Sequence, residues 1–282
     1  MVVAANNESF EESAGSAVGV SPASPASCLA AERGILLKQR VALITAGDCR
    51  VGRRVASLLA GQGASIVLCG VDQAKGSQVV HRLEKKGVRA RFYLVDVADP
   101  EDVKAAVKDT VATFGKIDIV CNNASFSLLG DDASVLDFTP ESWERVVNLS
   151  LRGIFSFSQC ALPFLSRSAR GSIINIVPYP RKGMHVVEGT ERGWMMAMTR
   201  DIAEGATKLG VRANLIWPHV AVSGATLSSY QIALAKQVFR MAKRDRTAAR
   251  AIARAALYLA SDESVDVTGA MVIVDADYPQ WA

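Results

Sequence analysis

The regular alternation of short apolar runs with longer amphipathic segments, which begins near Arg40, constrains the fold of this chain more than any other feature. Short apolar runs are typical of buried strands in parallel sheets, and the segments between them carry the periodicity of helices. Strands that alternate with helices form an α/β fold, in which a doubly wound parallel sheet has helices on both faces. The apolar runs are residues 40–46, 65–70, 89–97, 117–123, 171–177, 211–218 and 270–275.

The chain of 282 residues divides into two parts of unequal length. Residues 1–35 are rich in Ala, Ser, Asn and Pro and show no periodicity, so we predict a disordered N-terminal tail. The tail lacks the apolar run of a signal peptide, and it is too acidic and too poor in Arg for a transit peptide. Residues 36–282 are long enough for one large core, and we predict a single Rossmann-like domain there.

Composition argues against several classes of function. The formal net charge is only +4, and the basic cluster in residues 236–254 has helical spacing without a series of aromatic residues. We therefore expect a solvated helix face and no nucleic-acid site. The five Cys form no C-x-x-C pair and the three His are far apart, which favours reduced thiols in the cytoplasm over disulfides or a metal site. The apolar runs are strand-length, so we expect no membrane span.

The stretch from Gly171 to Pro218 has the order strand, long helix, strand, and it ends in the signature Asn-x-x-x-Pro that begins at Asn214. This order and this signature resemble the active-site half of the short-chain dehydrogenase/reductase (SDR) family. The resemblance spans about residues 38–278 and implies a small-molecule substrate and a nicotinamide dinucleotide. It also implies that the long helices at about 138–165 and 188–208 pair across a two-fold axis, which gives a homodimer or homotetramer.

The four catalytic residues usual in that family are all replaced in this chain. Counting back from Asn214 without a gap puts Glu188 at the position of the family's Tyr and Arg192 at the position of its Lys. Pro178 falls at the position of the Ser, and alignment of the preceding helix puts Ser150 at the position of the Asn. The resemblance therefore implies a non-standard active site.

Glu188 and Arg192 allow two interpretations. A carboxyl group with an ordinary pKa near 4.3 is a base at neutral pH, and an Arg one helical turn later keeps that carboxylate ionised. The pair would then act as a base and an anion holder, with Arg192 able to reach a ribose or an enolate oxygen. The alternative is an ordinary surface ion pair, in which Glu191 offers Arg192 a second partner.

Three other titratable groups lie close in sequence to these positions. Tyr179 follows the end of a strand, His185 precedes Glu188 by three residues, and His219 lies on the opposite loop. A histidine has the ordinary pKa that acid–base catalysis requires, but for each of the three the sequence favours a plain loop residue. The candidate catalytic residues are Glu188, Arg192, Arg152, Tyr179 and His185.

The turn after the first strand, Thr45 to Gly52, reads TAGDCRVG. It resembles the family's T-G-x-x-x-G-x-G, in which glycines let the backbone approach a pyrophosphate, but Ala46 and Arg50 replace two of the three glycines. As an obstruction, Arg50 would exclude the dinucleotide, as a bulky residue does in the halohydrin dehalogenases. As a ligand, it resembles the T-G-x-x-x-R-x-G variant of the pteridine reductase branch. We favour the ligand, because a guanidinium beside a helix N-terminus suits phosphate.

The resemblance also implies which cofactor is bound. The second strand ends in Gly70 where an acid would bind a ribose 2′-hydroxyl or repel a 2′-phosphate, and with Arg50 this predicts NADP(H) in preference to NAD(H). Other contacts follow from matches to the family's adenine site, its Asn-Asn-Ala-Gly motif and its nicotinamide-binding Thr. The implied cofactor contacts are Thr45, Gly47, Arg50, Val51, Gly52, Asp96, Val97, Asn122, Ala124, Arg192 and Ser223.

Three functions of different classes are compatible with these residues. The first is an NADP(H)-dependent reductase with a non-standard proton donor, which transforms a small biosynthetic intermediate. The second is a non-redox cyclase, isomerase or lyase, similar in kind to the halohydrin dehalogenases and the fungal alkaloid reductase/Diels–Alderases, with Arg152 and Glu188 as its charged pocket residues. The third is a pseudoenzyme kept for binding or assembly, because a fold alone does not define a function.

Overall fold

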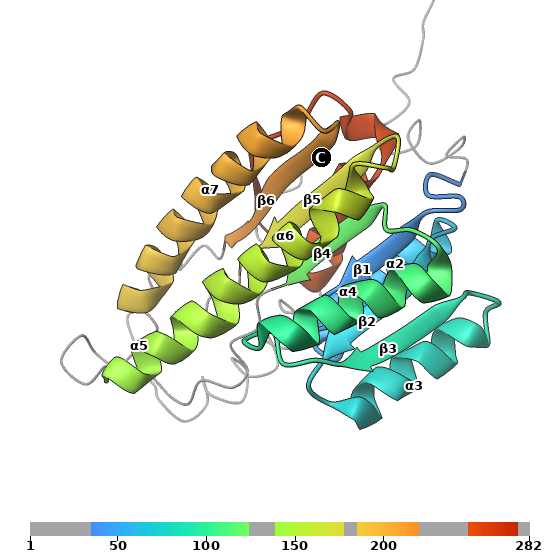
Figure 1. The fold of residues 1–282 in the computed structure, drawn as a ribbon, viewed down its shortest axis with the longest axis horizontal. Coiled ribbons are helices and arrows are strands. Elements are labelled where there is room, and N and C mark those ends of the chain that lie inside the picture. Colours follow the sequence, from blue (N-terminus) through green and yellow to red (C-terminus); the bar gives the residue numbers. More distant parts are fainter. Residues whose placement is uncertain (1–34, 124–138, 178–184, 220–247, 276–282) are drawn as a thin grey trace, which may run out of the picture. The chain divides into compact units, whose positions relative to one another are not determined.

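A computed structural model describes residues 35–123, 139–177, 185–219 and 248–275 (Figure 1). Within these ranges seven strands form one sheet in the order β3-β2-β1-β4-β5-β6-β7, and all neighbouring strands are parallel. Each strand overlaps one predicted apolar run, which confirms the α/β, doubly wound fold. The strands are β1 (Val41–Ile44), β2 (Ser65–Gly70), β3 (Ala90–Leu94), β4 (Ile119–Asn123), β5 (Gly171–Ile176), β6 (Val211–His219) and β7 (Met271–Asp275).

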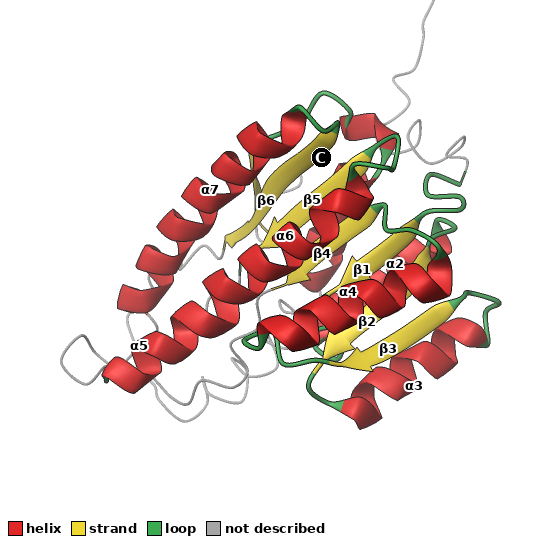
Figure 2. Cartoon of the chain, in the orientation of Figure 1, coloured by secondary structure: helices red, strands yellow, loops and turns green. Residues whose placement is uncertain are grey.

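Helices cover both faces of the sheet. Helices α4 (Pro100–Phe114), α6 (Gly153–Leu165) and α7 (His185–Thr207) lie on the near face in Figure 2. Helices α2 (Arg50–Gly61) and α3 (Gln73–Glu84), together with the helical residues 248–260, pack on the other face. This two-sided cover explains why the strands are nearly continuous apolar runs, since both of their faces are buried.

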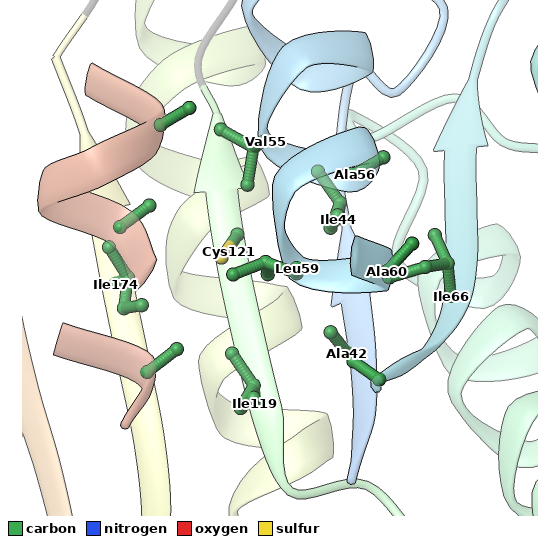
Figure 3. Packing of buried hydrophobic residues seen from close by; sticks show 14 of the residues in the cluster. Ala42, Ile44, Val55, Ala56, Leu59, Ala60, Ile66, Ile119, Cys121 and Ile174 are labelled. Atoms are coloured by element: carbon green, nitrogen blue, oxygen red, sulfur yellow. The ribbon is translucent and has the colours of Figure 1, made fainter. Parts of the chain in front are cut away.

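Successive strand side chains point to opposite faces, so the sheet separates two cores. In β1, Leu43 packs with the side chains of α4, α6 and α7, whereas Ile44 packs with those of α2, α3 and the helix at 248–260. Figure 3 shows the second core, in which Leu59 of α2 lies over Ile119 and Cys121 of β4. Both cores are built from side chains with almost no exposure, which anchors the ends of the strands in place.

Local signals in the sequence begin and end the helices. Asp72 caps α3 by accepting a hydrogen bond from the backbone N–H of Lys75 at 2.9 Å. Asp99 caps α4 in the same way through Glu101, ahead of Pro100, whose ring is favourable in the first turn of a helix. Gly115 ends α4 with a φ of 83°, a conformation that favours glycine.

The predicted long helix at 138–165 begins as expected but is interrupted. Helix α5 (Pro140–Val146) starts at a proline, which suits the first turn of a helix, and passes into a π-helix, Val147–Arg152, before the α-helix resumes as α6. A π-turn contains extra residues and therefore rotates the face that the following helix presents to the core. Sequence periodicity predicts one continuous helix here, because a single wide turn changes the pattern of apolar residues very little.

The three methionines of α7 belong mainly to the core. Met195 is completely buried beside Ile154, Val177 and Leu215, and Met196 and Met198 pack against this cluster. Within one subunit, they already fill the space between α7 and the carboxyl ends of β5 and β6.

Several predictions concern residues outside the described ranges. The N-terminal tail and most of the basic cluster at 236–254 lie there, so these interpretations stay predictions. Within the described ranges, no helix has the length and apolar character needed to cross a membrane. In the same residues, no group of three or more His, Cys, Asp or Glu side chains is arranged to bind a metal ion, and all four cysteines are free.

Candidate functional site

The carboxyl ends of β1 and β4 form the switch point of the sheet, because the strand order reverses direction between them. In open parallel sheets, ligands bind outside the carboxyl ends of the strands at this point. The glycine turn, Thr45–Gly52, follows β1 and leads directly into α2. The topology therefore brings this turn to the predicted place for a dinucleotide.

Hydrogen bonds fasten the glycine turn to β4. The hydroxyl of Thr45 accepts a bond from the backbone N–H of Asn123 at 2.9 Å, and the backbone N–H of Thr45 donates to the carbonyl of Cys121 at 3.0 Å. The side-chain amide of Asn123 donates to the Sγ of Cys49 at 3.1 Å. These bonds hold the start of α2 in a defined position above the switch point.

Close packing explains why two glycines of the turn are kept. A Cβ on Gly52 would lie 2.3 Å from the backbone carbonyl oxygen of Ala46, and a Cβ on Gly47 would lie 2.7 Å from a methyl group of Leu68. Ala46 itself has a φ of 45°, in the left-handed region where the family usually has glycine. The turn therefore keeps its compact form despite the replacement of Gly by Ala, at a cost in backbone strain.

The N-terminus of α2 has the features of an anion site. Its first turn contains no acidic residue, and it begins with Arg50, whose side chain is exposed. Cys49 is the N-cap, and its Sγ accepts a bond from the backbone N–H of Gly52 at 3.4 Å. Burial raises the pKa of the Cys49 thiol, so the cap stays neutral and leaves the positive end of the helix available to phosphate. The turn therefore fits a dinucleotide.

An acidic side chain lies beside Gly70, at the end of β2. The carboxylate of Asp48 accepts hydrogen bonds from the backbone N–H groups of Val71 at 3.1 Å and Asp72 at 2.8 Å. A Cβ on Gly70 would lie 2.6 Å from Cγ and Oδ1 of Asp48. The prediction that this point is free of acid is wrong, because Gly70 is only the strand residue and the Asp48 carboxylate lies beside it. The sequence does contain a signal for this contact: the glycine turn carries an Asp, and the second strand ends in Gly instead of an acid.

Asp96 and Val97 lie in the turn between β3 and α4, as predicted. Asp96 is exposed, and its carboxylate accepts a hydrogen bond from the backbone N–H of Ala98 at 2.9 Å. Val97 is partly buried and packs close to Gly153, where an added Cβ would lie 3.1 Å from the Cβ of Val97. The predicted adenine contacts are therefore packed against the start of α6, next to the π-helix.

Asn122 lies beneath the switch point in a chain of buried hydrogen bonds. Its amide donates to Ser158 at 3.1 Å and to Asn175 at 2.9 Å, and the amide of Asn175 donates to Thr199 at 2.8 Å. These bonds connect β4 and β5 with α6 and α7. Asn122 is completely buried, so in this structure its side chain organises the floor of the site. Its Oδ1 is the one buried side-chain atom of the described residues without a partner.

The structure describes only part of the predicted active site. Ser150 has 2% exposure and lies in the π-helix, whereas Arg152 at the end of that helix is exposed. His185, Glu188 and Arg192 fall in the first two turns of α7, on one face by helical spacing, and their side chains are not described. Pro178, Tyr179, Ala124 and Ser223 lie outside the described residues.

An aromatic contact joins α5 to α7. The rings of Trp143 in α5 and Trp194 in α7 meet edge to face, with centroids 5.3 Å apart and an angle of 80°. Trp194 is two residues beyond Arg192, so this contact ties α5 to the part of α7 that follows the predicted Glu188–Arg192 pair.

Comparison of the sequence with known protein families agrees with this fold. The sequence model of the family described as "Enoyl-(Acyl carrier protein) reductase" matches residues 46–278, which is most of the chain. The chain belongs to the short-chain dehydrogenase/reductase (SDR) family. SDR proteins are oxidoreductases that bind NAD or NADP, and they act on small molecules and commonly form oligomers.

Relatives of known sequence cover nearly the whole SDR domain. The chain is 26% identical to "3-oxoacyl-[acyl-carrier-protein] reductase FabG" of Thermotoga maritima, over 85% of this chain and 97% of the relative. It is 29% identical to "Short-chain dehydrogenase reductase 5" of Arabidopsis thaliana, over 86% and 95%. It is 27% identical to the "Cyclohexanol dehydrogenase" of an Acinetobacter species, over 85% and 94%.

Solved structures show the same fold. An NAD⁺-bound xylitol dehydrogenase superposes with a TM-score of 0.72 at 24% identity, over 84% of this chain and 98% of that protein. A hydroxysteroid dehydrogenase from Escherichia coli superposes with a TM-score of 0.71 at 22% identity, over 88% and 98%. At such identities the likeness shows the SDR fold alone.

Proposed function

We propose that this protein binds a nicotinamide dinucleotide at its glycine turn and acts as an SDR oxidoreductase with a non-standard active site on a small biosynthetic intermediate. The observation that carries this proposal is the glycine turn itself. Gly47 and Gly52 keep its compact form, Thr45 ties it to β4, and the acid-free start of α2 favours phosphate. The four free cysteines of the described chain suit a reducing compartment such as the cytoplasm.

Two features favour different dinucleotides. NADP(H) is favoured by Arg50 beside the predicted phosphate site and by the lack of an acid at Gly70, the end of β2. The Asp48 carboxylate beside Gly70 favours NAD(H) instead, since a carboxylate repels a 2′-phosphate and accepts a hydrogen bond from a 2′-hydroxyl.

The replaced residues restrict the reaction. A bound, reduced dinucleotide supplies a hydride, and the substrate must then accept it without the family's Tyr as proton donor. An iminium carbon meets this requirement, because the C=N electron pair moves to the nitrogen and no proton is needed. An activated alkene meets it when its enolate oxygen is stabilised, a role we assign to the fixed charge of Arg192. A proton from water then completes the reaction at the enolate carbon, with Glu188 as the base that relays it.

A non-redox reaction is the second candidate. It is favoured by the types of residue at positions 150, 178, 188 and 192, all of which differ from the family's catalytic set. In that case Glu188 and Arg152 would move protons and hold charge on the substrate, and the dinucleotide would be absent or unconsumed. Failure to bind a dinucleotide would identify the non-redox candidate, and oxidation of bound NAD(P)H during turnover would identify the redox one.

We expect Arg50→Ala to weaken NAD(P)H binding by about tenfold, because a charge-assisted hydrogen bond to phosphate is worth roughly 1.5–3 kcal/mol. Calorimetric titration of the purified protein measures this change. Arg54→Ala is the matched control, because Arg54 is an exposed arginine one turn further along the same helix. Its affinity should change less than about twofold. Tighter binding by Arg50→Ala would identify Arg50 as an obstruction and favour the non-redox reaction.

We expect a homodimer or homotetramer at micromolar concentration, because two helices of one face expose large apolar side chains. Phe155 of α6 is 49% exposed and Trp194 of α7 is 38% exposed. Size-exclusion chromatography with light scattering gives the mass. Phe155→Asp should shift the protein toward the monomer, whereas Val265→Asp, at a side chain that is 50% exposed outside both helices, should not. A monomeric wild type would contradict this expectation.

A further inference from the structure

We infer that Asp48, from the glycine turn, takes the place of the acid that is missing at Gly70 and makes the protein selective for NAD(H) over NADP(H). This inference rests on the proposed dinucleotide binding and specifies its selectivity. It also reverses the preference that the sequence alone predicted.

The Asp48 carboxylate fills the space beside Gly70. A side chain at position 70 would begin at a Cβ that lies 2.6 Å from Cγ and Oδ1 of Asp48 and 2.9 Å from its Oδ2. The Asp48 carboxylate therefore occupies the space into which an acid at the end of β2 would extend. Gly70 and Asp48 are a matched pair, because any side chain at position 70 would collide with this carboxylate.

Two backbone hydrogen bonds orient the Asp48 carboxylate. The bonds from the backbone N–H groups of Val71 and Asp72 both end on Oδ2 of Asp48. They fix the carboxylate in one orientation. None of the described residues donates a hydrogen bond to Oδ1, so this oxygen can accept one from a ribose hydroxyl. Only 9% of Asp48 is exposed, which limits how far water can screen its charge.

Charges around Asp48 do not cancel its effect. Lys75 lies within electrostatic range of Asp48 and Arg53, but its ammonium is paired with Asp72 at 2.6 Å. The Lys75 ammonium is thus engaged by Asp72 and does not pair with the carboxylate of Asp48. A 2′-phosphate placed there would meet the fixed, poorly hydrated carboxylate of Asp48 at short range. Repulsion between such groups corresponds to about tenfold or more in affinity.

Calorimetric titration with NADH and with NADPH tests this inference on the full chain. The wild type should bind NADH about tenfold or more tightly than NADPH. Asp48→Asn keeps an oxygen for the two backbone N–H groups and removes the charge, so it should reduce this ratio about tenfold, mainly through tighter NADPH binding. Asp72→Asn is the matched control, because it removes a neighbouring carboxylate and keeps a good N-cap; the ratio should change less than about threefold.

A second variant tests the exchange of positions. Asp48→Ser combined with Gly70→Asp moves the acid back to the end of β2 and should restore the preference for NADH that Asp48→Ser alone loses. A wild type that prefers NADPH, or a ratio that Asp48→Asn leaves unchanged, would overturn the inference while dinucleotide binding stands. Binding of neither dinucleotide would overturn the proposed function and this inference together.

Discussion

Wild-type protein supplied with NADH or NADPH is expected to reduce no activated ketone at a measurable rate, and Glu188→Tyr alone is expected not to rescue it. General acid catalysis by a positioned side chain is worth about 10² to 10⁴-fold, and the predicted alignment puts other residue types at all four positions of the usual set. Such residues act as a unit, so one restored member returns little. Glu188→Tyr also removes the carboxylate that we predict to pair with Arg192.

The fourfold variant Ser150→Asn, Pro178→Ser, Glu188→Tyr and Arg192→Lys should gain about 10² to 10⁴-fold over wild type in steady-state assays with a panel of activated ketones. Glu191→Tyr is the matched control, because it adds a phenol to the same helix at a position that the alignment does not assign to catalysis. Strong turnover by the wild type would contradict the alignment. It would identify Tyr179 or His185 as the acid.

Gly52→Ala is expected to abolish dinucleotide binding and to lower the free energy of unfolding by about 3 kcal/mol. The added Cβ would lie 2.3 Å from the carbonyl oxygen of Ala46 and 2.9 Å from the Cα of Gly47. Both atoms belong to the backbone, so no side-chain rotation relieves the contact. The turn must therefore open, and the start of α2 would then move away from β4, to which Thr45 is hydrogen-bonded. Urea denaturation and dinucleotide titration measure the two effects.

Gly61→Ala is the control for this substitution. It makes the same change at the other end of α2, where an added Cβ would meet no atom within 4 Å. Because Ala is a better helix former than Gly, this variant should be stabilised by about 0.5–1 kcal/mol and should bind dinucleotide normally. If Gly52→Ala also bound dinucleotide normally, the turn would not be the phosphate site.

Periodicity alone was sufficient to predict the sheet, because a strand buried on both faces must be apolar along its whole length. It was not sufficient to predict the π-helix at Val147–Arg152, which changes the helix by about one residue per turn and leaves the apolar pattern intact. This error matters for function, since Ser150, the residue aligned with the family's Asn, lies inside the π-helix and is buried.

The sequence by itself predicts which positions correspond to the family's active site. Counting back from Asn214 without a gap reaches Arg192 and Glu188, which both lie in α7, and their assignment to catalysis stays a prediction. It also determined the glycine turn, because Thr45, Gly47 and Gly52 are neighbours along the chain and their spacing defines the motif.

Only the tertiary structure decided what surrounds the predicted cofactor site. Asp48 and Gly70 are 22 residues apart, and they meet because β1 and β2 are parallel neighbours whose carboxyl ends share one edge of the sheet. Asn122, Asn175 and Thr199 are likewise separated along the chain and meet across two strands and a helix. Motifs record residues that are close in sequence, whereas the field at a binding site is set by charges that are close in space. For that reason the sequence predicted a position free of acid, and the fold placed a carboxylate there.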